Sequence, residues 1–296
     1  MEWYFVLLIV LGSLLLLFLI VFFILFKPGN VKKCYKYDWL FKAPIAHRGY
    51  FNNEFGIVEN TIPAFKIAIE RGYNIETDLS LTKDNYIVIY HDNDFKRLYG
   101  LDKKVEELTL EEIKALKLSN SDEKILEFSE FLSLIDGKTG LLLEFKSTSK
   151  KRNEILCKEA VRMLKDYKGH WAAQSFDPVL VSWFKKNYPL IPRGQLYMKF
   201  DLKEYKNKAK GKGFKGFVDV LTRWLYNNKL VHLISKPVFI AHDVKAIDLM
   251  AKFTHCYVPL LVWTVTNKEE YDKSVKKVDN IIFENLNLDS NGKFKG

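Results

Sequence analysis

Cysteine is scarce in this sequence: Cys34, Cys157 and Cys256 are its only three, and they stand far apart. They offer neither the close spacing of a thiolate metal site nor the even number of a disulfide framework, so a reducing compartment fits slightly better than an oxidising one. The composition of disordered chains is also missing, since 48% of the residues are hydrophobic and 15% are aromatic. A chain of 296 residues has room for a membrane helix and one large folded domain.

Charge is absent from Trp3 to Phe26, where nearly every residue is Leu, Ile, Val or Phe. As a helix this run is roughly 36 Å long, enough to cross a hydrocarbon core of roughly 30 Å. A cleaved signal peptide fits less well, because only Glu2 is charged before the run and no small-residue cleavage site follows it. We therefore expect residues 1–26 to be a single transmembrane anchor.

Basic residues outnumber acidic ones, and the formal net charge is +10. Such a balance favours a nucleic acid or an anionic lipid surface as partner. We expect no nucleic-acid binding, because no recognition motif appears and the anchor favours the membrane. Residues 27–42 are expected to form a basic linker, which when extended reaches roughly 50 Å and would let the following domain reorient. Because positive flanks stay in the cytoplasm, its lysines predict a cell-membrane protein with a cytoplasmic domain.

Residues 43–290 alternate short apolar runs with helical patterns, and residues 291–296 are a short tail. Nine strands are predicted, at 45–46, 75–79, 86–90, 141–145, 171–174, 194–197, 238–241, 260–265 and 280–283. Helical patterns separate many of them, which is typical of a parallel β/α architecture. The size of the region predicts a single (β/α)8 barrel of the TIM type. Since that barrel needs eight strands, one of the nine lies outside it.

Polar side chains stand at the ends of the first four predicted strands. They are His47 and Arg48, then Glu76 and Asp78, then His91, then Glu144 and Lys146. In a barrel the C-terminal strand ends converge on one mouth. Three carboxylates there repel one another unless a cation joins them, and oxygen ligands suit Mg²⁺ or Ca²⁺. Two histidines beside such an ion form the acid–base pair that phosphodiester cleavage needs.

These motifs occur in an order that resembles the glycerophosphodiester phosphodiesterase family, over most of the chain after the linker. The residues that carry the likeness are Ala46-His47-Arg48-Gly49, Glu59-Asn60-Thr61, Ile75-Glu76-Thr77-Asp78, Val88-Ile89-Tyr90-His91-Asp92, Glu144-Phe145-Lys146, Gln174-Ser175-Phe176-Asp177 and Trp263-Thr264-Val265. The resemblance implies a barrel fold and release of glycerol 3-phosphate from an alcohol. In the family's mechanism a substrate hydroxyl attacks the phosphorus first, and water then opens a cyclic intermediate.

The resemblance also implies roles for particular residues. Glu76, Asp78 and Glu144 hold one divalent cation, Mg²⁺ or Ca²⁺, while His47 acts as base and His91 as acid. Arg48 and Lys146 supply positive charge to the phosphate, Glu59 orders the first loop or helps at the metal, and Trp263 is either a stacking wall for the substrate or part of the barrel core. The other histidines, His170, His232, His242 and His255, match no family motif and are expected to be structural or on the surface.

Two stretches depart from the family pattern. Residues 279–284 read Asp-Asn-Ile-Ile-Phe-Glu, where the family more often carries Gly and a Thr-Asp pair. Residues 199–238 are longer and more basic than expected, with seven lysines between Lys199 and Lys215 that alternate with aromatic residues. This insertion is either a solvated, mobile loop or a segment that leans on an anionic leaflet. Both departures bear on the choice of substrate more than on the reaction.

The leading hypothesis is metal-dependent hydrolysis of glycerophosphodiesters, on membrane-derived substrates such as lysophospholipids. A lysophospholipase D or sphingomyelinase D-like activity is the alternative on the same scaffold. A third possibility is a catalytically silent, membrane-bound lipid-binding module. The paired histidines and three carboxylates argue against it, because a binding module has no need of an acid and a base.

Overall fold

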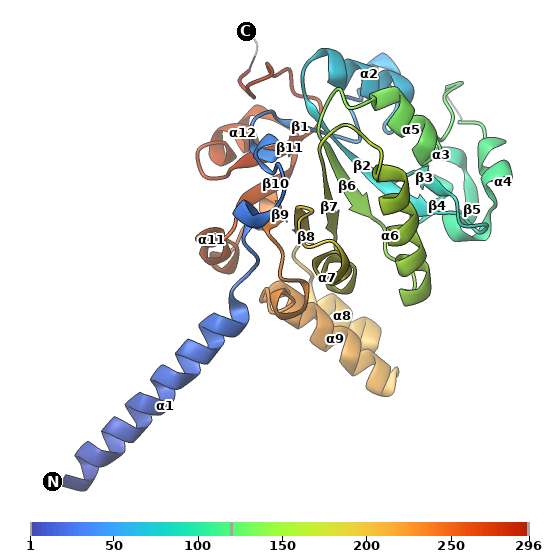
Figure 1. Cartoon of the computed structure of the whole chain (residues 1–296). Helices are drawn as coiled ribbons and strands as arrows, with labels where there is room; N and C mark the ends of the chain where they lie inside the picture. Colours follow the sequence, from blue (N-terminus) through green and yellow to red (C-terminus); the bar gives the residue numbers. More distant parts are fainter. Residues whose placement is uncertain (1, 119–120, 295–296) are drawn as a thin grey trace.

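Eight parallel strands close into a barrel in the computed structural model, which describes residues 2–118 and 121–294 (Figure 1). The barrel strands are β1 (Ile45–His47), β2 (Asn74–Leu81), β6 (Leu141–Phe145), β7 (Trp171–Ser175), β8 (Arg193–Tyr197), β9 (Phe239–Asp243), β10 (Leu260–Val265) and β11 (Asn280–Phe283). Neighbours follow in chain order, and β1 pairs with both β2 and β11, which closes the barrel. The predicted (β/α)8 barrel is confirmed.

Helices surround the barrel and connect its strands (Figure 1). They are α2 (Ile62–Glu70), α5 (Phe128–Ile135), α6 (Lys150–Leu164), α7 (Pro178–Asn187), α8 (Leu202–Ala209), α9 (Gly213–Asn227), α10 (His232–Ser235), α11 (Leu249–His255) and α12 (Lys268–Ser274). A small subdomain after β2 adds β4 (Asp94–Phe95), α3 (Lys96–Tyr99), β5 (Leu101–Lys104) and α4 (Leu110–Lys114). This subdomain has its own apolar cluster around Phe95 and Val105.

The ninth strand, β3 (Ile87–Ile89), lies outside the barrel and runs antiparallel to β2. The expectation that His91 ends a barrel strand is therefore wrong. Strand β2 continues past the mouth, and β3 returns along it with Leu79 opposite Ile89. The amide of Tyr90 donates to the carbonyl of Asp78 at 3.1 Å, so the hairpin carries His91 back to the mouth from a different direction.

Alternating side chains divide the apolar residues between two cores. On β6, Leu142 faces the barrel interior, together with Ile45, Ala172 and Leu261 from other strands. Its neighbours Leu141 and Leu143 face outward into the layer between strands and helices. This period-two alternation is the ordinary geometry of a strand, and it also fixes which polar residues point into the mouth.

Residues 27–42 are folded against the N-terminal end of the barrel and do not form an extended linker. They contain two short helical turns, η1 (Val31–Lys33) and η2 (Asp38–Phe41), and Trp39 and Leu40 join the interior core. The side-chain amide of Asn74 donates to the carbonyl of Trp39 at 3.0 Å. A Cβ at position 140 would collide with the Trp39 ring, so glycine there allows the close approach. The expected freedom to reorient is therefore absent from this structure.

The basic insertion is also folded. Residues 202–227 form α8 and α9, two packed helices joined by a short turn, and α10 follows. Asn227 ties the end of the pair back to the chain through its side chain. Its Nδ2 donates to the carbonyl of Phe200 at 2.9 Å, and its Oδ1 accepts from the backbone amide of Phe200 at 3.0 Å. Of the two alternatives given for this segment, an irregular loop is therefore not what the structure shows.

Helix α1 (Glu2–Phe26) projects away from the barrel (Figure 1). Its stretch from Trp3 to Val21 is long and apolar enough to cross a membrane, and it is not buried against the described chain. This finding rests on length and composition, which a signal sequence also satisfies. Met1, the first residue of the expected anchor, and 295–296, the last two of the expected tail, lie outside the described residues.

Candidate active site

The register of β1, β2 and β6 brings the predicted polar residues to one end of the barrel. His47 is paired with Glu76 across β1 and β2, and Asp78 is paired with Glu144 across β2 and β6. Because these residues are spaced by two along their strands, their side chains share the interior face. Gln174 on β7 stands beside Glu144 and donates to Glu76 at 3.3 Å. These polar side chains therefore lie together at the mouth, next to the apolar side chains of the barrel interior.

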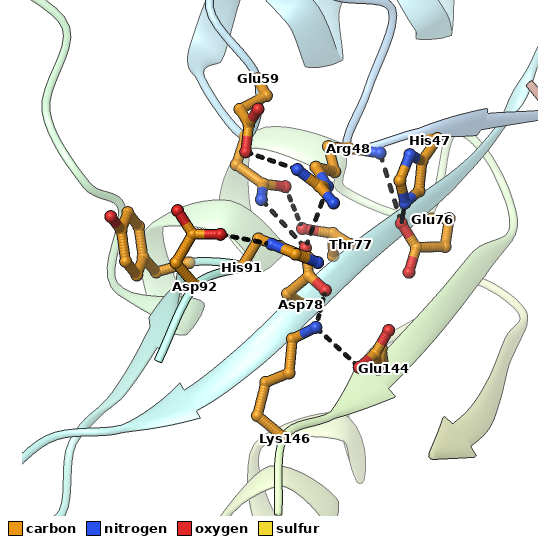
Figure 2. A network of polar contacts seen from close by, with 12 residues as sticks. His47, Arg48, Glu59, Glu76, Thr77, Asp78, His91, Asp92, Glu144 and Lys146 are labelled. Carbon is orange, nitrogen blue, oxygen red and sulfur yellow. Dashed lines mark hydrogen bonds and ion pairs between the residues drawn. The ribbon is translucent and has the colours of Figure 1, made fainter. Parts of the chain in front are cut away.

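Glu76, Asp78 and Glu144 form a compact, buried carboxylate cluster (Figure 2). One oxygen from each lies within 4.8 Å of the others. Lys146 lies against the cluster, with its Nζ 2.8 Å from Asp78 Oδ1 and 2.6 Å from Glu144 Oε1. Three carboxylates and one ammonium leave negative charge uncompensated at that point. A hard divalent cation fits this donor set, because it prefers oxygen ligands and supplies the missing charge.

The electrostatics of the cluster point the same way. Burial, with the repulsion of Asp78 and Glu144, raises the pKa of Glu76 well above its usual value. Burial alone would also raise the pKa of Asp78, but Lys146 and His91 hold it well below its usual range. Burial opposes the charged form of Lys146 as well, yet Asp78 and Glu144 raise its pKa. The cluster thus stabilises the positive charge of Lys146, and the raised pKa of Glu76 indicates a carboxyl group that lacks a matching cation.

His47 is held between two carboxylates. Its Nδ1 contacts Glu284 at the end of β11, and its Nε2 lies 3.7 Å from Glu76 Oε2. Because a carboxylate only accepts hydrogen bonds, Nδ1–H donates to Glu284 and Nε2 is directed at the cluster. The ring is mostly buried. Its orientation is thus fixed by a residue 237 positions away in the chain.

His91 is oriented in a similar way by its neighbour. Its Nδ1 lies 2.7 Å from Asp92 Oδ1, and Asp92 Oδ2 accepts from Arg97 Nε at 2.7 Å. Burial would raise the pKa of Asp92, but the hydrogen bonds from His91 and Arg97 lower it to about 2. Asp92 therefore remains ionised and keeps Nδ1 of His91 as a donor. Figure 2 shows both imidazoles around the carboxylate cluster.

Arg48 and Glu59 form the rim on the β1 side. Arg48 and Gly49 adopt left-handed backbone conformations that turn the chain sharply after β1. The turn lets the Arg48 amide donate to Glu76 Oε2 at 3.3 Å and places its guanidinium 3.8 Å from Asp78. Glu59 lies 2.8 Å from Arg48 and also binds Arg97, so it holds two guanidinium groups and stands outside the carboxylate cluster.

A groove of about 700 Å³ opens beside the cluster. His91, Arg97 and Lys146 line one part of it, and Phe176 lines another. Trp263 packs edge-on against Phe176 with ring centroids 5.6 Å apart, and its Nε1 donates to the Ala241 carbonyl at 3.2 Å. Trp263 is half-buried between the barrel interior and the mouth, so both expected roles, core and wall, remain compatible with its place.

Several residues of this network were not assigned to the site from the sequence, among them Arg97, Asn60 and Glu284. Asn60 donates to Asp78 Oδ2 at 3.1 Å and accepts from Thr77 at 2.7 Å, which fixes the Asp78 carboxylate. The sequence could have indicated Asn60, because it directly follows Glu59 in one of the family motifs. Glu284 stands at the end of a predicted strand, which was a signal of the same kind as that for His47. The other histidines lie outside this network: His232 and His242 are buried around Tyr197, while His170 is exposed.

The family comparison covers most of the chain. The model of the glycerophosphoryl diester phosphodiesterase family matches residues 47–287. A glycerophosphodiester phosphodiesterase from Caldanaerobacter subterraneus subsp. tengcongensis is 40% identical over 111 residues, which cover 35% of this chain and 44% of that protein. The matched region thus spans less than two thirds of the curated relatives, 63% in the case of a putative family member from Bacillus subtilis.

Solved structures extend the likeness to the whole barrel. A glycerophosphodiester phosphodiesterase from Thermotoga maritima is 26% identical, with a TM-score of 0.57 over 81% of this chain and 94% of its own. A phosphodiesterase from Oleispira antarctica, solved with the product sn-glycerol-3-phosphate, shares the fold at 20% identity, with a TM-score of 0.63 over 81% of this chain and 91% of its own. With the family model spanning the barrel and its mouth, the chain belongs to the glycerophosphoryl diester phosphodiesterase family.

Proposed function

We propose that this chain hydrolyses glycerophosphodiesters to glycerol 3-phosphate and an alcohol. The observation that carries the proposal is one mouth in which two oriented imidazoles flank a buried carboxylate cluster, in a chain that belongs to a phosphodiesterase family. Each element alone has a structural explanation, such as a buried ion-pair network. Their assembly at one mouth, beside a groove of about 700 Å³ that His91, Glu144 and Lys146 line, favours catalysis.

Glu76, Asp78 and Glu144 would hold one divalent cation, Mg²⁺ or Ca²⁺. Such an ion supplies positive charge to phosphoryl oxygens as their charge grows. The fit rests on the oxygen-only donor set and on its excess of negative charge. Lys146 limits that excess without removing it, because it contacts only two of the three carboxylates. It is also a candidate, with Arg48, to bind the phosphate directly.

The two histidines divide the proton transfers. His47 is the proposed base, because Glu284 holds its Nδ1–H and leaves Nε2 as the acceptor that faces the cluster. It takes the proton from the hydroxyl that attacks the phosphorus. His91 is the proposed acid, because Asp92 accepts from its Nδ1 and holds the ring at the groove, where the alcohol would leave. It gives a proton to the alcohol oxygen as the phosphorus–oxygen bond breaks, and water then opens the resulting cyclic phosphate with the two proton transfers reversed.

The remaining site residues position the substrate in this proposal. Glu59 keeps the guanidinium of Arg48 above Asp78, where it meets a phosphate at the mouth. Phe176, backed by Trp263, offers an apolar wall for the alcohol or for an acyl chain. An apolar wall beside a cationic rim would also accept a lysophospholipid, whose cleavage at the same bond would release lysophosphatidic acid in place of glycerol 3-phosphate.

The proposed organisation places the enzyme on the cell membrane. Residues 1–26 are the single-pass anchor, 43–290 the catalytic barrel and 291–296 the tail, and 27–42 connect anchor and barrel while covering the barrel's N-terminal end. The lysines that follow α1 favour a cytoplasmic barrel. Labelling an added cysteine at position 2 or 294 with an impermeant thiol reagent in intact cells would test this orientation. Labelling at position 294 but not at position 2 would contradict it.

The function is tested with the full chain in detergent and a panel of glycerophosphodiesters and lysophospholipids, with and without Mg²⁺ or Ca²⁺. We expect release of glycerol 3-phosphate that needs the cation. His47→Ala and Glu144→Ala should abolish it, while His255→Ala and Glu269→Ala, matched changes outside the site, should not. Release of lysophosphatidic acid, or of ceramide phosphate from added sphingomyelin, would instead indicate a phospholipase D-like activity. No cation-dependent cleavage of any diester, with the fold intact, would contradict the proposal.

The division between acid and base is tested with two leaving groups. Nitrophenolate leaves from its phosphate ester without protonation, whereas choline or ethanolamine needs a proton from an acid as it leaves. We expect His91→Ala to lose much less activity on the nitrophenyl ester than on the choline ester. His47→Ala should lose activity on both. The reverse pattern would exchange the two roles.

A further inference from the structure

Helix α9 presents an apolar stripe to its surroundings. The stripe consists of Phe214, Phe217, Val218, Leu221 and Trp224, which are between 40% and 82% exposed. Their spacing of three and four places them on one face of the helix. The opposite face of α9 packs on the rest of the domain, because Gly216 lies close to Ala209 of α8 and Tyr226 is buried against β8. The stripe is therefore not a core face that the described chain covers.

Helix α10, which follows the stripe in the chain, lies beside the end of α1. Helix α10 follows α9 directly, exposes Leu233 and Ile234, and contacts α1. Hydrogen bonds fix the same junction: Lys236 Nζ donates to the carbonyl of Lys27 at 2.9 Å, and the Gly29 amide donates to the carbonyl of Pro237 at 2.7 Å. In Figure 1, α1 and the α8–α9 pair both leave the lower side of the barrel, and α9 runs crosswise to α1.

The flanks of the stripe are basic. Lys210, Lys212 and Lys215 lie at the turn before α9 and in its first residues, and all three are exposed. None of them pairs with an acidic side chain in the described part of the chain, whereas Lys208 on α8 pairs with Glu204. Aromatic and aliphatic side chains bordered by lysines are the composition of helices that lie in the interface of an anionic bilayer.

We propose that α9 and α10 lie on the anionic leaflet next to which α1 ends, with the stripe seated at the level of the lipid head groups. The occupant follows from continuity with α1, because a face joined to the end of a membrane span lies where the bilayer surface is. A crosswise helix is also the orientation that an interfacial helix needs beside a span. The barrel is then held at two points, and its orientation to the membrane is fixed. The inference rests on α1 spanning the bilayer and not on the proposed activity.

The test uses the full chain in nanodiscs, with single labelling sites for an environment-sensitive fluorophore. Exposed Cys256 is first replaced by serine, while Cys34 and Cys157 are buried. The label is placed at Phe217→Cys on the stripe, at Ser13→Cys inside α1, and at Phe55→Cys, an exposed control far from the stripe in sequence. Nitroxide lipids, labelled near the glycerol or near the chain ends, then quench the fluorophore according to depth.

We expect position 217 to be quenched several-fold more than position 55, and most by the shallow nitroxide. Position 13 should be quenched most by the deep one. Quenching at 13 but not at 217 overturns the inference, and no quenching at 13 overturns the anchor on which it rests. The fluorophore at position 217 could instead self-quench against the same label on a second chain, an effect that dilution of the protein in lipid removes. That result would make the stripe a dimer interface and would also overturn the inference.

A second set of variants tests the basic flank of the stripe, formed by Lys210, Lys212 and Lys215. Lys210→Glu, Lys212→Glu and Lys215→Glu together should reduce the quenching at 217 several-fold in anionic nanodiscs. Lys103→Glu, Lys117→Glu and Lys124→Glu, an equal change of charge at exposed sites in the subdomain after β2, should leave it unchanged. Equal effects of both triples would contradict a specific role for this flank, and an unchanged thermal melt shows that α8 and α9 remain folded.

Discussion

Glu284 offers the sharpest test of how this site works, because the sequence alone gave it no role. Its carboxylate accepts from Nδ1–H of His47 and fixes the ring with Nε2 toward the carboxylate cluster. The change Glu284→Gln keeps the shape and removes the charge. A hydrogen bond to a charged group contributes about 1.5–3 kcal/mol. Because about 1.4 kcal/mol corresponds to a tenfold change in rate, kcat/KM should fall roughly 10- to 150-fold.

The assay is steady-state hydrolysis at saturating cation, with kcat and KM determined separately. We expect the loss in kcat, because Glu284 acts through His47 and does not touch the groove. Glu269→Gln is the matched control, since this exposed glutamate on α12 pairs only with Lys273 of the same helix. A Glu284→Gln enzyme within twofold of the wild type would refute a positioning role. A higher cation concentration for half-maximal activity would instead assign Glu284 to metal binding.

Three further predictions concern stability, each measured by chemical unfolding of the full chain in detergent. Lys146→Met leaves Asp78 and Glu144 without their ammonium, so without added cation the chain should lose about 3–5 kcal/mol, and saturating Mg²⁺ or Ca²⁺ should restore much of it. Trp39→Ala removes a large side chain from the N-terminal end of the barrel and should cost about 3–5 kcal/mol. Burial, with the nearby Lys229, lowers the pKa of His232 from 6.5 to about 3. The free energy of unfolding is therefore highest above about pH 6.5 and falls at lower pH, where the unfolded chain gains a proton that the folded chain does not. Between about pH 7.5 and 5.5 the wild type should lose about 1.4 kcal/mol more stability than His232→Gln.

Each of these has a distinct contrary outcome. If the Lys146→Met enzyme is equally unstable with and without cation, the carboxylates do not share an ion. If Trp39→Ala costs no more than a surface change, residues 27–42 are not docked in solution. If wild type and His232→Gln lose stability in parallel as the pH falls, then His232 is not the buried neutral imidazole that its surroundings predict.

Much of the fold and of the site could be predicted from the sequence, because local patterns carried them. Strand-length apolar runs separated by helical patterns indicated a β/α barrel, and eight of the nine predicted strands form it. Polar residues spaced by two at strand ends, such as Glu76 and Asp78, point into the mouth as that spacing predicts. The strand period is a property of the backbone, so it is readable without any knowledge of the neighbours.

Tertiary structure decided what depends on partners far away in the chain. The run Ile87–Ile89 has the same apolar pattern whether it pairs parallel or antiparallel, and only the hairpin with β2 places it outside the barrel. The bond between Glu284 and His47 needs β1 and β11 to meet, which barrel closure alone achieves. Residues 27–42 and the lysine-rich insertion resemble solvated chain in composition, but Trp39 and Tyr226 anchor them in cores that other elements supply. A sequence therefore states which side chains a strand or helix presents, while the fold determines what each of them meets.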